Sequence, residues 1–156
     1  MRVGILGLGY WGPNLIRNFS GNSDVREVSG CDLKEARLKW INERFPSVKL
    51  SSDPNKFVTN PELDCVAIAL PVGLHFEYAK KALESGKHIW VEKPFTATSA
   101  EAVELIELAE KKKLTIFVDH TFIYTGAVQK IKELVNNDVL GDILYFDSVR
   151  VNLGLF

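Results

Sequence analysis

The chain has 156 residues, of which 46% are hydrophobic and 25% charged, so it is long enough for one domain with a buried core and too short for two full-sized domains. Its 19 basic and 20 acidic residues are interleaved and give a formal net charge of −1. This balance argues against a nucleic-acid surface or a polybasic membrane patch, and it favours a small molecule as the partner.

A short strand that leads directly into a glycine loop opens the chain. Residues 3–6 form the expected strand, and Gly7, Gly9 and Gly12 follow in a G-x-G-x-x-G pattern before a helix that begins near Pro13. In dinucleotide-binding domains the first glycine permits a tight turn, the second lets the backbone approach a pyrophosphate, and the third lets the helix pack closely on the strand. A proline suits the first helical turn, and the positive end of the helix dipole would face the pyrophosphate.

The second apolar run, residues 25–31, ends in Asp32, about 20 residues after the loop, where a ribose-binding acid is expected. Its carboxylate would accept both adenosine ribose hydroxyls and repel a 2′-phosphate, which predicts NAD rather than NADP as the cofactor. Lys34 and Arg37 lie close enough to leave some tolerance for NADP, or they are ordinary surface cations. Strand, helix and acid together favour a dinucleotide site over a purely structural glycine turn.

Short apolar runs alternate with amphipathic stretches along most of the chain, which predicts an α/β fold with a doubly wound parallel (Rossmann) sheet. The runs are residues 3–6, 25–31, 48–50, 65–70, 88–91 and 114–118. Helix signals between them include an N-cap at Asp53 before Pro54, a capping box from Thr98 to Glu101, and Gly86 just past a helix over residues 74–85. The helical spacing predicts core faces at Phe76, Ala79 and Leu83, and at Val103, Ile106 and Ala109.

The end of the chain departs from this rhythm. A helix is expected over residues 125–136 and a turn over 137–142, after which residues 143–155 alternate between apolar and polar. Alternation is typical of an antiparallel strand with one buried face, so we expect a Rossmann domain over residues 1–141 and the first strand of a truncated antiparallel α+β domain over 142–156. We expect such a fragment to be inactive alone. Its open strand edge favours a homo-oligomer, with residues 143–156 either mediating self-association or disordered.

Residues that directly follow the strands are the candidates for chemistry, because ligands of open α/β sheets bind beyond the carboxyl ends of the strands. Leu70 and Pro71 end one strand, and His75 either contacts the pyrophosphate or ribose or simply starts a helix. Glu92 and Lys93 follow the next strand. The Lys93 ammonium beside a nicotinamide would bind a substrate hydroxyl and favour the alkoxide, which predicts a catalytic role. Glu92 either orients that lysine, caps a cofactor group or is a surface acid.

These motifs resemble the glucose–fructose oxidoreductase/inositol dehydrogenase (Gfo/Idh/MocA) family. The resemblance rests on residues 7–12, on Leu70-Pro71 with His75, and on residues 86–94, which end in Glu-Lys-Pro. It implies NAD(P)-dependent oxidation or reduction at a CH–OH group of a sugar, polyol or nucleotide sugar, with Lys93 at the position of the family's active-site lysine. It also implies that residues 118–122 lie near the nicotinamide, although His120 is equally suited to a structural role. Family members take an aspartate and a histidine from a second domain, and such residues would follow Phe156.

Two other readings stay open: a non-catalytic NAD-binding sensor, and a Rossmann-like methyltransferase. Lys93 argues against the sensor, which has no need of a cation at a hydride-transfer face, and Pro13 and the Glu-Lys-Pro element argue against the methyltransferase. Cys31 and Cys65 lie in apolar runs, as buried hydrophobes of a reducing cytoplasm do, and no metal ligand set is apparent. No apolar run reaches the roughly 20 residues of a membrane span, and the N-terminus lacks the features of a signal peptide.

The predicted catalytic residue is Lys93, and the predicted cofactor-binding residues are Gly7, Gly9, Tyr10, Trp11, Gly12, Asp32, Leu70, Pro71, His75, Glu92, Lys93 and His120.

Overall fold

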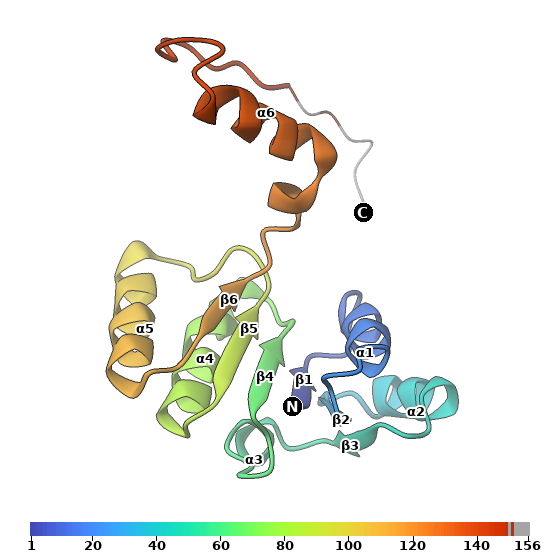
Figure 1. Ribbon diagram of the computed structural model, residues 1–156. Coiled ribbons are helices and arrows are strands. Elements are labelled where there is room, and N and C mark those ends of the chain that lie inside the picture. The colour runs from blue at the N-terminus through green and yellow to red at the C-terminus, as the bar shows by residue number, and fades with distance from the viewer. Residues whose placement is uncertain (150, 152–156) are drawn as a thin grey trace. The chain divides into compact units, whose positions relative to one another are not determined.

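The structure is a computed structural model that describes residues 1–149 and 151 (Figure 1). By its internal contacts the chain divides into two compact units, Met1–Asp119 and His120–Phe156. The two units are described separately below.

The first unit is built on a six-stranded, all-parallel sheet, which confirms the predicted fold class. Its spatial order is β3-β2-β1-β4-β5-β6. The strands are β1 (Arg2–Leu6), β2 (Glu27–Cys31), β3 (Lys49–Ser51), β4 (Cys65–Ile68), β5 (His88–Val91) and β6 (Ile116–Val118). The order reverses between β1 and β4, and this switch point is where doubly wound sheets bind ligands beyond their carboxyl ends.

Helices cover both faces of this sheet. They are α1 (Gly12–Ser20), α2 (Glu35–Arg44), α3 (Pro54–Val58), α4 (His75–Glu84) and α5 (Ser99–Lys112), with a short 3-10 turn η1 (Val72–Leu74) before α4. Figure 1 shows α1 and α2 beside β1–β3, and α4 and α5 beside β4–β6. Neighbouring strand residues point to opposite faces, so Ile5 packs with the α1 and α2 side chains while Leu6 packs with those of α3, α4 and α5.

The local helix signals are confirmed. The Asp53 carboxylate accepts the backbone N–H of Lys56 at the start of α3, and Thr98 and Glu101 form both halves of the capping box of α5. A cap of this kind contributes about 0.5–2 kcal/mol. Gly86 follows α4 with a φ of +77°, the left-handed conformation that ends many helices at low cost in glycine.

The predicted core face of α5 is wrong at two positions. Val103 and Ile106 are 53% and 45% exposed, whereas Leu105 is fully buried and Ala109 is 4% exposed. The helix has small or apolar side chains on several sides, so its sequence permits more than one buried stripe, and packing against α4 selects the stripe that contains Leu105 and Ala109.

The second unit contains a 3-10 turn η2 (Thr121–Tyr124) and α6 (Gly126–Asn136), which confirms the helix expected at residues 125–136. The predicted strand over 143–155 is not formed at residues 143–149 or 151, and residues 150 and 152–155 lie outside the described part of the chain. A strand requires a neighbouring backbone for its hydrogen bonds, and within the described residues of this unit no strand pairs with this segment. The domain boundary after Gly141 stays a prediction.

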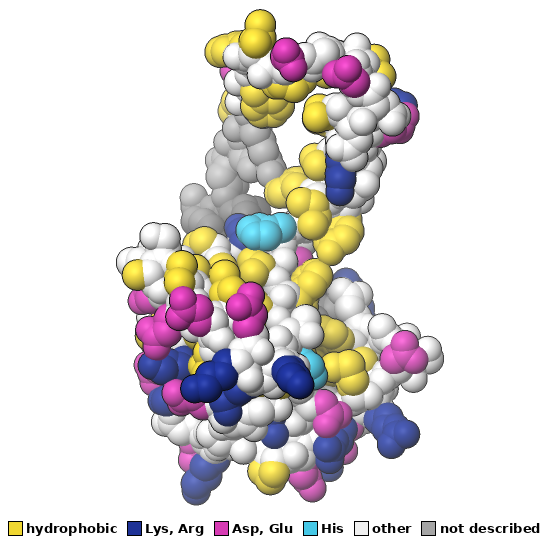
Figure 2. Space-filling view, turned by 60° about the vertical axis from the view of Figure 1, so that its left-hand side comes forward, with side chains coloured by type: hydrophobic (Ala, Val, Ile, Leu, Met, Phe, Trp, Pro, Cys, Tyr) yellow, Lys and Arg dark blue, Asp and Glu magenta, His cyan; other side chains and the backbone are white. Residues whose placement is uncertain are grey.

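The surface agrees with the charge pattern of the sequence. Figure 2 shows positive and negative side chains intermingled on the visible face of the first unit. Among the helices that the structure describes, none has both the length and the apolar composition needed to cross a membrane.

Candidate functional site

The sheet register places the chemistry-bearing residues in one row. The last residues of β2, β1, β4, β5 and β6 are mutually paired, so the next residues along the chain follow at the same level of the carboxyl edge. At this level each neighbouring pair of these strands is joined by one more backbone hydrogen bond, for example from the Glu92 N–H to the Ile68 carbonyl oxygen at 3.0 Å. The resulting row is Asp32, Gly7, Ala69, Glu92 and Asp119.

The glycine loop has the geometry that its sequence predicts. Gly7 has a φ of +97°, and a Cβ there would lie 2.4 Å from the Ala69 carbonyl oxygen, so a side chain would be both strained and obstructed. A Cβ at Gly12 would lie 2.3 Å from the Gly7 carbonyl oxygen, so the start of α1 packs directly on the loop backbone. At Gly9, in contrast, a Cβ would have no neighbour within 4 Å, which leaves open space beside the backbone.

The N-terminus of α1 faces this loop without a side-chain cap. Trp11 at the N-cap position makes no capping hydrogen bond, Pro13 lies in the first turn, and that turn has no acidic residue. An uncapped helix N-terminus presents backbone N–H groups and partial positive charge, which suits an anion such as a pyrophosphate.

Asp32 is bound to the backbone at two points. One carboxylate oxygen accepts the Leu8 N–H and the other accepts the Lys34 N–H, each at 2.8 Å. The carboxylate therefore ties the end of β2 to the glycine loop. Each oxygen has a second lone pair, so the half-buried carboxylate keeps acceptor capacity for ligand hydroxyls.

A narrow apolar cavity of about 160 Å³ opens beside Asp32. Its walls come from the ends of β1 and β2, from the start of α3, from the segment between β4 and α4, and from α4 itself. The lining residues include Leu33, Pro54, Leu70, Leu74 and Tyr78. Its apolar walls suit a flat heteroaromatic ring, and the adjoining carboxylate suits a ribose.

His75 lies inside the protein rather than at the open edge. It is the first residue of α4 and is 1% exposed. Its Nδ1 lies 2.9 Å from the Pro94 carbonyl oxygen and its Nε2 lies 2.7 Å from the Leu70 carbonyl oxygen. Both ring nitrogens are thus engaged by protein, and the contact with pyrophosphate or ribose stays a prediction.

Glu92 and Lys93 differ sharply in environment. Glu92 is 8% exposed, and burial, followed by the negative charge of Asp119, raises the pKa of its carboxyl group. The backbone N–H of Lys93 and the charge of its side chain act in the opposite direction. Lys93 itself is exposed at the carboxyl edge, and the bond to Pro94 is cis.

The remaining predicted site residues are exposed. Tyr10 is 68% and Trp11 47% exposed, and their rings meet edge to face at 5.1 Å between centroids. Pro71 is exposed beside half-buried Leu70. His120 is exposed and belongs to the second unit, so its place near the nicotinamide stays a prediction.

Sequence reasoning missed two parts of this site. Leu33, Pro54, Leu74 and Tyr78 come from separate segments and share no motif, so only the fold brings them to one cavity. Asp119 lies within the predicted motif at residues 118–122, but its influence on Glu92 depends on the pairing of β5 with β6.

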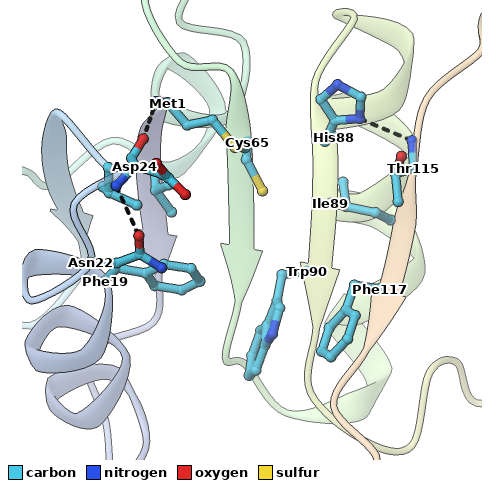
Figure 3. Close-up of a pocket in the computed structure, with 12 residues that line it drawn as sticks. Met1, Phe19, Asn22, Asp24, Cys65, His88, Ile89, Trp90, Thr115 and Phe117 are labelled. Atoms are coloured by element: carbon cyan, nitrogen blue, oxygen red, sulfur yellow. Dashed lines mark hydrogen bonds between the residues drawn. The ribbon is translucent and has the colours of Figure 1, made fainter.

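A larger cavity, about 470 Å³, lies away from this row. It is lined at the amino ends of the strands by Met1, Cys65, His88 and Thr115, with Trp90 and Phe117 stacked on the same face of the sheet (Figure 3). It contains none of the predicted site residues. The described residues hold no group of three or more metal-ligating side chains, and Cys31 and Cys65 are free and buried.

Comparisons with known proteins show the family to which the chain belongs. Residues 1–120 match the family model GFO_IDH_MocA, described as an oxidoreductase family with an NAD-binding Rossmann fold. An uncharacterized oxidoreductase of Escherichia coli, YdgJ, is 34% identical over 95% of this chain and 42% of its own length. Myo-inositol 2-dehydrogenase of Thermotoga maritima is 27% identical over 90% of this chain and 42% of its length. A solved structure of biliverdin reductase from Synechocystis, in complex with biliverdin and NADP+, has a TM-score of 0.80 and 31% identity over 86% of this chain and 42% of that one. The chain thus spans about two fifths of each of these proteins.

Proposed function

The chain belongs to the GFO_IDH_MocA oxidoreductase family with an NAD-binding Rossmann fold, and on that basis we propose that it is the cofactor-binding part of an NAD-dependent enzyme acting on a CH–OH group. The proposed substrate class is a sugar, polyol or nucleotide sugar, which the similarity to a myo-inositol dehydrogenase supports. The observation that carries the proposal is the row at the carboxyl edge, with Asp32 on one side of the glycine loop and the Glu92-Lys93 turn on the other.

The residues of this edge fit NAD. The open space at Gly9 and the uncapped end of α1 would hold the pyrophosphate, Asp32 would accept the adenosine ribose hydroxyls, and the apolar cavity beside it would take the adenine. The adenosine half then lies over β1 and β2, and the nicotinamide half extends across the switch point toward β4 and β5. Tyr10, Trp11, Leu70, Pro71 and His120 are retained as proposed cofactor contacts.

Lys93 is the proposed catalytic residue. Bound NAD supplies the hydride acceptor. The exposed ammonium of Lys93 would donate a hydrogen bond to the substrate hydroxyl oxygen and stabilise the negative charge that grows there as the hydride leaves the same carbon. The buried carboxyl of Glu92, next to it in the chain, would set the local charge and hold the turn.

Calorimetric titration of the chain with NAD and with NADP tests the cofactor assignment. We expect NAD to bind more tightly, because the Asp32 carboxylate repels a 2′-phosphate. Equal or tighter binding of NADP would overturn the assignment to NAD, and the likeness to an NADP+-bound biliverdin reductase makes this a meaningful alternative.

Turnover assays on the full gene product, with a panel of sugars and polyols, test the reaction. We expect Lys93→Ala to lower turnover by roughly 10²-fold, the usual scale of a proton-transfer aid, while NAD affinity stays within a few-fold. Lys93→Arg keeps the charge but exchanges its proton poorly, so it separates a pure charge effect from proton transfer. Lys111→Ala, in the last turn of α5, is the matched surface control.

NAD binding without turnover on any substrate of the panel would instead indicate a non-catalytic NAD sensor. The proposal also places the protein in the cytoplasm, where buried free thiols persist, and assigns it a homo-oligomeric state. Light scattering of the purified protein checks the oligomeric state.

A further inference from the structure

The apolar cavity beside Asp32 is bounded by two different helices. Pro54, the first residue of α3, and Tyr78, within α4, line it together with Leu70 and Leu74. Leu74 and Tyr78 are four residues apart, which places them on one side of the helix and about one turn, or roughly 5.4 Å, from each other. Because Leu74 precedes α4 at the carboxyl edge of the sheet, Tyr78 forms the wall of the cavity that lies farther from that edge.

One side chain contacts both of these helices. The Lys81 ammonium lies 5.3 Å from the centroid of the Tyr78 ring, which is within the range of a cation–π contact. The same nitrogen donates a hydrogen bond of 2.8 Å to Oδ1 of Asn55, which follows Pro54 in α3. It donates another, of 2.7 Å, to the Glu77 carboxylate in its own helix. Lys81 therefore links the Tyr78 ring to the start of α3.

These contacts of Lys81 fix a position more than they stabilise the fold. The side chains of Lys81 and Glu77 are 37% and 51% exposed, and ion pairs at such positions contribute little to stability. The hydrogen bond to Glu77 raises the pKa of the Lys81 ammonium, so the cation persists at neutral pH. A permanent charge held between Asn55 and the Tyr78 ring restricts where that ring can lie.

We propose that Tyr78 contacts the far edge of the cofactor's base and that Lys81 is its positioning residue. This inference rests on the proposed function, because it takes the cavity as the adenine site. A purine that enters from the ribose side at Asp32 would extend toward Tyr78, whereas a pyrimidine has one ring fewer and would cover less of that apolar wall. The Tyr78 wall thus makes the cavity selective for a purine base, and Lys81 keeps the wall in place relative to α3.

Calorimetric titration of the chain with NAD and with nicotinamide cytosine dinucleotide tests the role of Tyr78. We expect wild type to prefer NAD, and Tyr78→Ala to weaken NAD binding by about 10-fold while binding of the cytosine analogue changes by less than about 2-fold. Tyr78→Leu preserves more of the packing on the core, so it should show the same trend if Tyr78→Ala does not fold. Tyr78→Phe keeps the ring and should keep the preference.

Two kinds of failure are distinguishable in this titration. NAD binding with an unchanged preference in the folded Ala or Leu variant, or loss of the preference in Tyr78→Phe, would overturn the assignment of Tyr78 and leave the proposed function standing. Absence of NAD binding by the wild-type chain would overturn the proposed function and this inference with it.

Lys80 provides the matched control for the role of Lys81. Its ammonium also contacts an aromatic ring, that of Phe76 at 5.6 Å, and also binds a carboxylate, that of Glu104 at 2.6 Å. The side chain of Lys80 is 39% exposed, close to the 37% of Lys81, but Lys80 links α4 to α5 rather than to α3.

Lys81→Met and Lys80→Met should therefore have similar, small effects on the melting temperature and different effects on base selectivity. We expect only Lys81→Met to lower the preference for NAD over the cytosine analogue, by about 2- to 5-fold, the scale of an exposed cation–π contact. Lys81→Arg keeps a cation that stacks on aromatic rings, so it should retain the preference. An equal effect of the two Met substitutions on the preference, or no effect of Lys81→Met, would refute the positioning role.

Discussion

Asp32 combines two tasks, and replacing it should separate them. Its carboxylate holds the glycine loop through the Leu8 and Lys34 N–H groups, each at 2.8 Å, and it is the proposed acceptor for the adenosine ribose. Asp32→Ala removes both backbone hydrogen bonds. At this half-buried position the freed amides regain water, so the expected loss is about 1–3 kcal/mol for the pair, or roughly 2–10 °C in melting temperature.

The effect on cofactor binding should be larger and selective. Loss of the ribose hydrogen bonds should weaken NAD binding by about 10- to 100-fold, or roughly 1.4–2.8 kcal/mol. NADP should lose less, because removal of the carboxylate also removes its repulsion of the 2′-phosphate. The ratio of the two dissociation constants, measured by calorimetry, should therefore move toward one.

Asp64→Ala is the matched control for this experiment. The Asp64 carboxylate also accepts two hydrogen bonds, from the backbone N–H and the guanidinium of Arg2, but it lies at the opposite, amino edge of the sheet. It should lower the melting temperature and leave both cofactor affinities unchanged. If Asp32→Ala behaves in the same way, with an unchanged ratio of NAD to NADP affinity, the carboxylate only holds the loop and does not read the ribose.

Three further results are expected. Burial raises the pKa of the Glu92 carboxyl, so the folded state binds the carboxyl proton more tightly than the unfolded chain does. Wild-type stability is therefore lost as pH rises from about 4.3 through the raised value. The melting temperature of Glu92→Gln should rise relative to that of wild type from about pH 4 to pH 7, and a difference in melting temperature that is constant with pH would contradict this. Burial raises the pKa of the Cys31 and Cys65 thiols to about 11, so a thiol reagent at neutral pH should label neither until the chain is unfolded, and rapid labelling of the native protein would disprove their burial. Asp32→Ala and Lys93→Ala should have additive effects on the free energy of the rate-limiting transition state in the full gene product, and a coupling above about 0.5 kcal/mol would show that the two ends of the site are not independent.

The parts of the fold that the sequence predicts are those fixed by neighbouring residues. The capping box at Thr98 and the proline after Asp53 act within one turn of helix, so their chemistry is legible without the rest of the chain. The glycine loop is equally local, because the positive φ of Gly7 and the close contact at Gly12 arise within six residues. The orientation of α5 is not local. Packing on α4 chooses between two stripes that the sequence alone leaves equivalent, and Val103 is exposed as a result.

The candidate site likewise has features that are predictable from neighbouring residues and features that depend on the tertiary fold. Asp32 is predictable as the residue after a strand, but its bond to Leu8 depends on the pairing of β1 with β2. His75 leaves two readings open in the sequence, because nothing near it indicates that the Leu70 and Pro94 carbonyls converge on its ring. That convergence requires β4 and β5 to be adjacent in the sheet, a property of the topology.

The topology also accounts for the size of ligand that the edge can serve. Asp32 follows β2 and Lys93 follows β5, with β1 and β4 between them, so three interstrand spacings of about 4.8 Å separate the two positions by roughly 14 Å. A ribose held by Asp32 does not reach Lys93 across that gap, whereas a dinucleotide laid over the glycine loop places its second ring near it. The chain therefore keeps recognition of the adenosine on one side of the switch point and the proposed hydride chemistry on the other. His75 lies on the second side of the switch point, where its ring contacts the carbonyl oxygens of Leu70 and Pro94.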